Sequence, residues 1–159
     1  MAISVRACLR CSKPVSIQAI PPISGTEGTY KMTLEGVSVM ICEENHKRLV
    51  YSDLAMRLMD HVADPDKSGL YAATRRGLFK KRTYCAKCTT ELPSGTADNK
   101  DYRVSVPLRN IEPVTVILSA PVIRCAQCGV EQLPDEADLL KYVFKAMTHA
   151  FRAAEIHAQ

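Results

Sequence analysis

The sequence has no long hydrophobic run. Its longest mostly apolar stretch, PVTVILSAPVI at residues 113–123, is interrupted by Pro and Ser, and a membrane-spanning helix needs roughly 20 apolar residues. The first residues, MAISVRAC, also lack the apolar central segment of a secretory signal. We therefore expect a cytoplasmic protein without a membrane partner, in which cysteines serve as metal ligands or redox groups rather than as disulfides.

Acidic side chains are missing from residues 67–90, which contain seven Lys and Arg residues with Tyr71, Phe79 and Tyr84 among them. Basic side chains beside aromatic ones can hold phosphates and stack on bases. The sequence therefore makes nucleic acid a possible partner. The alternative is a solvated linker whose charges offset nearby thiolates. The candidate nucleic-acid-binding residues are Arg75, Arg76, Lys80, Lys81 and Arg82.

The net charge of +4 gives no support to either interpretation, because it counts every thiol as neutral. If seven thiolates hold two Zn²⁺ ions, the sites contribute −7 + 4 = −3 and the net charge falls to about +1. The overall basicity therefore does not identify a partner.

The cysteines number seven, and an odd number does not suit a complete disulfide framework. Six of them form Cys-x-x-Cys pairs, whereas Cys42 stands alone. A Cys-x-x-Cys turn directs two thiolates at one ion, and tetrahedral zinc needs two such half-sites facing each other. The pairs are Cys8 and Cys11, Cys85 and Cys88, and Cys125 and Cys128.

An internal repeat assigns these half-sites to one another. The first copy runs from CLRC to LEGVSVMICEENH and the second from CAKC to ILSAPVIRCAQCG, so that Cys42 aligns with Cys125. The second copy is six residues longer, and we place the difference in a predicted loop, PSGTADNKDY at residues 93–102.

The repeat predicts two zinc ions per chain, each with four ligands. Gly129 follows the last cysteine, where such a turn often needs a positive φ. In the first copy a fourth ligand is missing from the cysteines, and His46 lies at the C-x-x-x-H spacing that can supply it. The predicted ligands are Cys8, Cys11, Cys42 and His46 in one site and Cys85, Cys88, Cys125 and Cys128 in the other.

Several alternatives are open from the sequence. His46 could lie on the surface, with water or another residue as the fourth ligand, although His61, His149 and His157 fall on predicted helices. The first Cys-x-x-Cys pair could instead join the turn at Cys125. A redox role, a catalytic zinc, and iron at the all-thiolate site are further options. We expect no enzymatic activity, because four protein ligands leave no open coordination position.

The pattern between the ligands is typical of β structure, and the pattern after them is helical. Pro21, Pro22 and a predicted loop from Gly25 to Gly28 separate the first two predicted strands. A helix begins at Ser52 as N-cap and ends before Asp64-Pro65; a longer one covers residues 135–158. The first helix presents one apolar face, formed by Leu54, Leu58, Met59 and Val62. The predicted strands are residues 15–20, 30–35, 37–41, 102–108 and 114–123.

Together these patterns predict an α+β fold of two tandem zinc-ribbon-like β hairpins, each followed by an α-helix, the last of them long. Residues 1–62 form the first unit, residues 63–84 a basic linker and residues 85–159 the second. The last helix carries an apolar stripe, which either docks on its own domain or pairs with a second copy or another protein. The stripe consists of Ala137, Leu140, Phe144, Met147, Phe151, Ala154 and Ala158.

The second copy resembles the YgiT-type zinc-finger family, which includes the zinc-binding N-terminal half of MqsA antitoxins. The matching residues are Cys85, Cys88, Cys125, Cys128 and Gly129, followed by Val130 and Glu131. Residues 8–62 are similar but more divergent, with His46 for the fourth cysteine and no glycine after it. The resemblance implies structural zinc. It does not extend to operator binding, for which MqsA antitoxins use a separate helix-turn-helix domain.

We expect a zinc-binding, non-enzymatic protein that acts as a protein-interaction or regulatory module, in a setting like that of toxin–antitoxin pairs. The alternative hypothesis is a nucleic-acid-binding zinc ribbon that uses residues 75–82.

Overall fold

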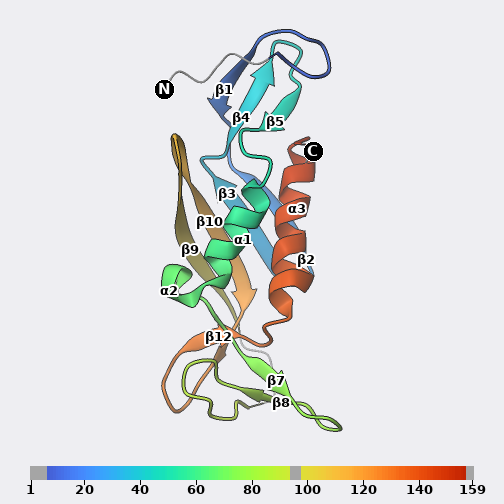
Figure 1. Cartoon of the computed structure of the whole chain (residues 1–159). Coiled ribbons are helices and arrows are strands. Elements are labelled where there is room, and N and C mark those ends of the chain that lie inside the picture. The colour runs from blue at the N-terminus through green and yellow to red at the C-terminus, as the bar shows by residue number, and fades with distance from the viewer. Residues whose placement is uncertain (1–6, 94–97, 157–159) are drawn as a thin grey trace.

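The computed structural model describes residues 7–93 and 98–156. As predicted, the fold is of the mixed α+β type, and its strands are mostly antiparallel. The molecule is elongated, with a central sheet covered by helices and a smaller β region at each end (Figure 1). None of the helices in the described part of the chain has the length and apolar character needed to span a membrane.

The central sheet has four strands in the order β2-β3-β10-β9. Strand β10 pairs with β9 along almost its whole length and with β3 on its other side, where Thr115 lies opposite Glu35. Alternate side chains of β10 are buried, from Val114 to Ala120, and form one layer of the main core. The strands are β2 (Ile23–Glu27), β3 (Tyr30–Glu35), β9 (Asn99–Leu108) and β10 (Ile111–Pro121).

This sheet takes two strands from residues 1–62 and two from residues 85–159. The tandem order of the repeats along the sequence therefore does not become two separate sheets in space. A lone two-stranded hairpin is marginally stable in water. Pairing β3 with β10 gives both hairpins a shared apolar face that two helices can cover.

The predicted loop from Gly25 to Gly28 was wrong for its first three residues, because they belong to β2 (Ile23–Glu27). Gly25, in the middle of this strand, leaves free the space that helix backbone occupies. A Cβ at Gly25 would overlap the carbonyl oxygen of Ala146 and the amide nitrogen of Ala150, and would lie 2.9 Å from the carbonyl carbon of His149. Gly25 thus marks a close approach of helix to strand and not a turn.

Helix α1 (Leu54–Ala63) buries the face that the sequence predicted, consisting of Leu54, Leu58, Met59 and Val62. The prediction of Ser52 as its N-cap was wrong. Asp53 occupies the N-cap position without a capping side-chain hydrogen bond, because its carboxylate accepts a hydrogen bond from Arg57 at 2.9 Å.

The last helix is shorter than predicted at both ends. It begins with a π-helical turn, η1 (Leu139–Val143), and continues as α3 (Phe144–Ala153). Residues before Leu139 are held elsewhere, since the Glu136 amide donates to the Ala73 carbonyl at 2.9 Å. At the other end Glu155 has a φ of 59°, and the Ile156 amide donates back to Phe151 at 3.0 Å. This left-handed cap ends the helix and buries Ile156 in the core.

The apolar stripe of this helix divides between core and surface. Met147 and Phe151 are buried where α3 lies along β2 and β3, and Phe144 is half-buried. Leu140 is 73% exposed, and Ala158 lies outside the described residues. Own-chain packing therefore accounts for the centre of the stripe, which is not accessible to a partner in the folded chain.

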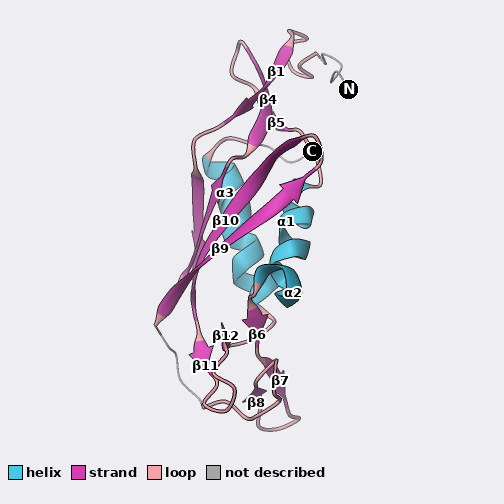
Figure 2. Cartoon of the chain, turned by 90° about the vertical axis from the view of Figure 1, so that its left-hand side faces the viewer, coloured by secondary structure: helices cyan, strands magenta, loops and turns pink. Residues whose placement is uncertain are grey.

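A small sheet lies at each end of the molecule. One end carries β1 (Val15–Ala19), β4 (Ser38–Cys42) and β5 (Lys47–Leu49) in the order β1-β4-β5. The other end carries β6 (Tyr71–Ala72), β11 (Ile123–Arg124) and β12 (Glu131–Leu133), in which β12 and β6 are parallel (Figure 2).

The basic segment at residues 63–84 is not an irregular linker. It contains α2 (Pro65–Ser68), β6 and a hairpin made of β7 (Thr74–Arg76) and β8 (Arg82–Tyr84). The predicted loop at residues 93–102 is also partly regular, since β9 begins at Asn99, and residues 94–97 lie outside the described part of the chain.

Candidate metal centres

The eight predicted ligand residues form two clusters, one at each end of the molecule. Within each cluster the ligand atoms all lie within 4.8 Å of one another. Cys8, Cys11, Cys42 and His46 gather around β4 and β5, and Cys85, Cys88, Cys125 and Cys128 gather between β8 and β12. The crossed alternative, with the first pair at the turn of Cys125, is therefore wrong.

The three Cys-x-x-Cys turns share one backbone geometry. In each turn the carbonyl of the first cysteine accepts a hydrogen bond from the amide four residues later, at 2.8–3.0 Å. That fourth residue is left-handed, as predicted for Gly129, which has a φ of 78°. Ser12 and Thr89 adopt the same conformation in the other two turns without being glycine. Both sulfurs of each turn consequently point to one side.

The turn after Cys42 is one residue shorter, and this explains why the partner of Cys42 is not a cysteine. The Asn45 amide donates to the Cys42 carbonyl at 2.9 Å, and Asn45 itself is left-handed, with a φ of 67°. In the repeat Asn45 aligns with Cys128. Because Asn45 makes the turn, the next residue, His46, faces the cluster from the position just before β5.

The distances between ligand atoms fit a tetrahedral zinc ion. With zinc–sulfur bonds of about 2.3 Å and zinc–nitrogen bonds of about 2.0 Å, two sulfurs lie about 3.8 Å apart and a sulfur and a nitrogen about 3.5 Å. The His46 Nδ1 atom lies 3.5 Å from the sulfurs of both Cys8 and Cys42. The sulfurs of Cys11 and Cys42 are 3.7 Å apart, and two sulfur pairs in the other cluster are 3.6 Å apart. All seven cysteines are free thiols.

The Cys85 thiol is supported by a buried polar side chain that the sequence did not single out. Gln132 on β12 is completely buried; its side-chain amide donates to the Cys85 sulfur at 3.2 Å and accepts from the Ala86 amide at 2.8 Å. Burial raises the pKa of Cys85, but hydrogen bonds from the Cys88 amide, Gln132 and the Lys87 amide outweigh it and lower the pKa to about 6. Only the fold shows that Gln132 faces this turn.

The first cluster has a similar backbone contribution. The amides of Arg10 and Cys11 lower the pKa of Cys8 to about 6. A hydrogen bond from the Lys13 amide lowers the pKa of Cys11. Burial and the neighbouring thiols outweigh this effect and raise the pKa to about 11. Thiols this close cannot all ionise by themselves, whereas a divalent cation would stabilise every thiolate. The donor set thus fits a metal ion.

The first cluster is also attached to the central body. Lys47, next to His46, donates to the carbonyl of Ala154 at the end of α3, at 3.4 Å. Lys13 forms ion pairs with Glu43 at 3.0 Å and Glu44 at 2.9 Å, both on the surface. The remaining described histidines do not compete for a metal, since His149 contacts Glu27 at 3.0 Å and His61 belongs to no cluster.

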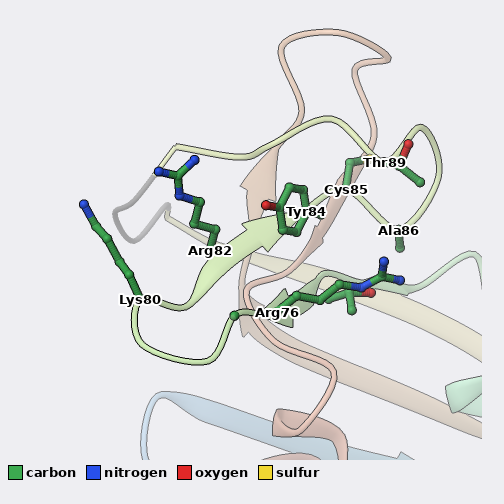
Figure 3. A pocket seen from close by; sticks show the side chains of 9 residues that line it. Arg76, Lys80, Arg82, Tyr84, Cys85, Ala86 and Thr89 are labelled. Carbon is green, nitrogen blue, oxygen red and sulfur yellow. The ribbon is translucent and has the colours of Figure 1, made fainter.

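The five predicted nucleic-acid-binding residues all lie on the β7–β8 hairpin, but on two faces. Arg76, Lys80 and Arg82 line an open cavity of about 450 Å³ together with Tyr84 and residues of the Cys85 turn (Figure 3). Arg75 and Lys81 line a different cavity beside Asp60 and Asp135, and Arg75 lies 3.7 Å from the Asp135 carboxylate.

No protein-family model, curated protein or solved structure matches this chain. The resemblance to YgiT-type zinc fingers is therefore supported only by the motif residues themselves.

Proposed function

We propose that this chain is a cytoplasmic, zinc-binding, non-enzymatic interaction module that holds two Zn²⁺ ions as structural elements. The observation that supports the proposal is the geometry of the two clusters. Each offers four ligand atoms at the separations that a tetrahedral ion requires. Four protein ligands complete the coordination, so that neither ion retains a position for a substrate or an activated water.

Zinc suits both donor sets. Three thiolates with one imidazole, and four thiolates, are both common structural zinc sites. Iron also binds four thiolates in tetrahedral geometry, which makes it a competitor at the Cys85 cluster. The imidazole of His46 in the other cluster favours zinc there.

The small separate core at the end with the Cys85 cluster supports a structural role for the metal there. The main core contains the buried side chains of the central sheet, α1 and α3. Among the described residues, the end with the Cys85 cluster has a small separate core, in which Cys85 and Cys125 are themselves members with Ala73, Leu92 and Ile123. A short β region of this kind is marginal without a metal ion or disulfides. Zinc bound to turns far apart in the sequence would stabilise it.

The partner in this proposal is a protein, either a different one or a second copy. The exposed side chain of Leu140 on η1 supports this, since it adjoins the half-buried Leu139 along an open cavity. The resemblance to the YgiT-type family supports a regulatory setting such as a toxin–antitoxin pair.

The test is metal analysis combined with native mass spectrometry. We expect two zinc ions per chain, and one after the substitution His46→Ala. The matched control His61→Ala, on a surface of α1 away from both clusters, should retain two. One ion in the wild-type chain, or iron with visible thiolate absorption, would contradict the proposal.

A second measurement tests whether the zinc is structural. Hydrogen exchange after removal of metal by a chelator should show early loss of protection in β4, β5, β11 and β12, while β3 and β10 remain protected. Equal exchange before and after chelation would show that the ions do not stabilise the ends.

A further inference from the structure

The β7–β8 hairpin presents two chemically different faces. Its register places Thr74 opposite Tyr84, Arg75 opposite Thr83 and Arg76 opposite Arg82. Because alternate residues of a strand share a face, Arg76, Arg82 and Tyr84 lie on the same side, and Arg75 lies on the other. Lys80, in the connecting loop, joins the first group along the cavity of about 450 Å³ (Figure 3).

The face with Arg76 carries positive charge that the protein does not neutralise. Arg76 and Arg82 are direct cross-strand neighbours, and like charges at such positions destabilise a hairpin. In the described ranges 7–93 and 98–156, no ion pair includes Arg76 or Lys80, and Arg82 has only a half-exposed Glu91 at 3.6 Å. Three cations around one open cavity fit an anionic ligand.

The tip of the same hairpin exposes two large apolar side chains. Leu78 and Phe79 are 96% and 103% exposed. The loop has a defined shape, since Gly77 has a φ of 132° and a Cβ there would overlap the Lys80 carbonyl group. The chain therefore holds an aromatic ring in water in the same loop as Lys80 and next to it in the sequence, at a position where the ring contributes nothing to the core.

We propose that this face binds single-stranded nucleic acid, independently of the proposed protein partner. Arg76, Lys80 and Arg82 contact successive phosphates, and Phe79 provides a ring on which an unpaired base stacks. A duplex fits less well, because its bases are already stacked on one another and offer Phe79 no exposed face. The groove also includes Cys85, Ala86 and Thr89 of the metal-binding turn, so the zinc site shapes it.

Only part of the basic stretch belongs to this binding face. Arg75 faces Asp135, and Lys81 shares its cavity with Asp60 and Asp135. These two residues are therefore excluded from the binding face, although they belong to the same run of basic residues. They provide a control with the same chemistry and the same change in charge.

The experiment measures fluorescence anisotropy of a fluorescein-labelled oligothymidylate and a single-stranded RNA of equal length with the zinc-loaded full chain. If three phosphates are neutralised, affinity should fall with salt at a logarithmic slope of about −2, or about 15- to 20-fold between about 50 and 200 mM salt. Arg76→Gln with Lys80→Gln should leave one phosphate contact and make the slope shallower, at about −0.7, whereas Arg75→Gln with Lys81→Gln should leave it unchanged. Phe79→Ala should weaken binding about 5- to 160-fold.

Several results would overturn the proposal. One is equal weakening by the two double variants, which would indicate only a general charge effect. Absence of binding to both oligonucleotides would do so as well. Equal competition by a duplex of the same sequence would exclude single-strand recognition. Binding to vesicles that contain phosphatidylserine, without binding to either oligonucleotide, would identify a membrane surface as the target of the hairpin.

Discussion

The substitution Gly25→Ala tests the closest contact in the central body. Gly25 lies in the middle of β2, directly under α3, and the atoms that a new Cβ would meet belong to the backbone of Ala146, His149 and Ala150. Backbone atoms cannot rotate away as a side chain can. A single added methyl group must therefore displace α3 from the sheet or bend β2.

The size of the effect follows from what α3 buries. Overpacking a core by one carbon costs about 1–3 kcal/mol, and more where the surroundings cannot adjust. Moving α3 outward also loosens the buried Ala146, Met147, Ala150 and Phe151. Replacing Gly by Ala recovers about 0.4–1 kcal/mol through the unfolded chain. Because the surrounding atoms are backbone, the upper end of the overpacking range applies, about 3 kcal/mol. After subtraction of the unfolded-state gain, we expect a net loss of about 2–2.6 kcal/mol in the free energy of unfolding, or on the order of 5–10 °C in Tm.

The assay is urea unfolding of the zinc-saturated chain, followed by far-ultraviolet circular dichroism. Gly69→Ala provides the control, because Gly69 follows α2 with a φ of 72° and a Cβ there meets no atom within 4 Å. Its cost should be only that of the left-handed backbone, about 1 kcal/mol. If Gly25→Ala loses no more stability than Gly69→Ala, the close packing of α3 on β2 is wrong.

Three further predictions concern the clusters and the core. His46→Ala should expose the thiols of the first cluster to a colorimetric thiol reagent, since three thiolates alone hold zinc less well. His46→Cys should restore protection. Unchanged protection in the Ala variant would exclude His46 as a ligand. Phe151→Glu should lower the free energy of unfolding by about 3–5 kcal/mol in thermal unfolding, and Leu140→Glu by less than about 0.5 kcal/mol; equal effects would show that Phe151 is not in the core. Because hydrogen bonds lower the pKa of Cys85 to about 6, its thiolate stabilises the fold above the ordinary value of 9.0, and this contribution is lost as the pH falls through about 6. Gln132→Leu removes one of these bonds, so zinc release on acidification, followed with a zinc indicator, should begin at a higher pH than in wild type.

Sequence reasoning located the candidate ligands because their chemistry is local. A Cys-x-x-Cys turn brings its two sulfurs together through hydrogen bonds within a few residues, and the repeat paired the turns. The C-x-x-x-H spacing from Cys42 could also be counted, and it identified His46 as the candidate fourth ligand. Apolar periodicity predicted the buried face of α1 for the same reason, since a helix places residues three and four apart on one side.

The sequence-based predictions failed where the role of a residue depends on contacts with a distant part of the chain. In the sequence Gly25 cannot be distinguished from a glycine in a turn, but its role depends on the backbone of Ala146, more than a hundred residues later. Nothing in the sequence around Gln132 indicates that its side-chain amide donates a hydrogen bond to the sulfur of Cys85. The end of α3 depends on Ile156, which turns back into the core after a left-handed residue that is not glycine.

The sequence by itself determined which residues cluster as candidate ligands, the α+β class, and the strands β1, β3, β4, β9 and β10, because these depend on spacing and side-chain type over short distances. Only the tertiary structure decided that β3 pairs with β10, so that the two repeats share one sheet and one core. It also divided the basic stretch, placing Arg76 on an open face and Arg75 beside Asp135. The physical reason is that strand pairing and the direction of a hairpin face result from non-local contacts, whose partners no short stretch of sequence specifies.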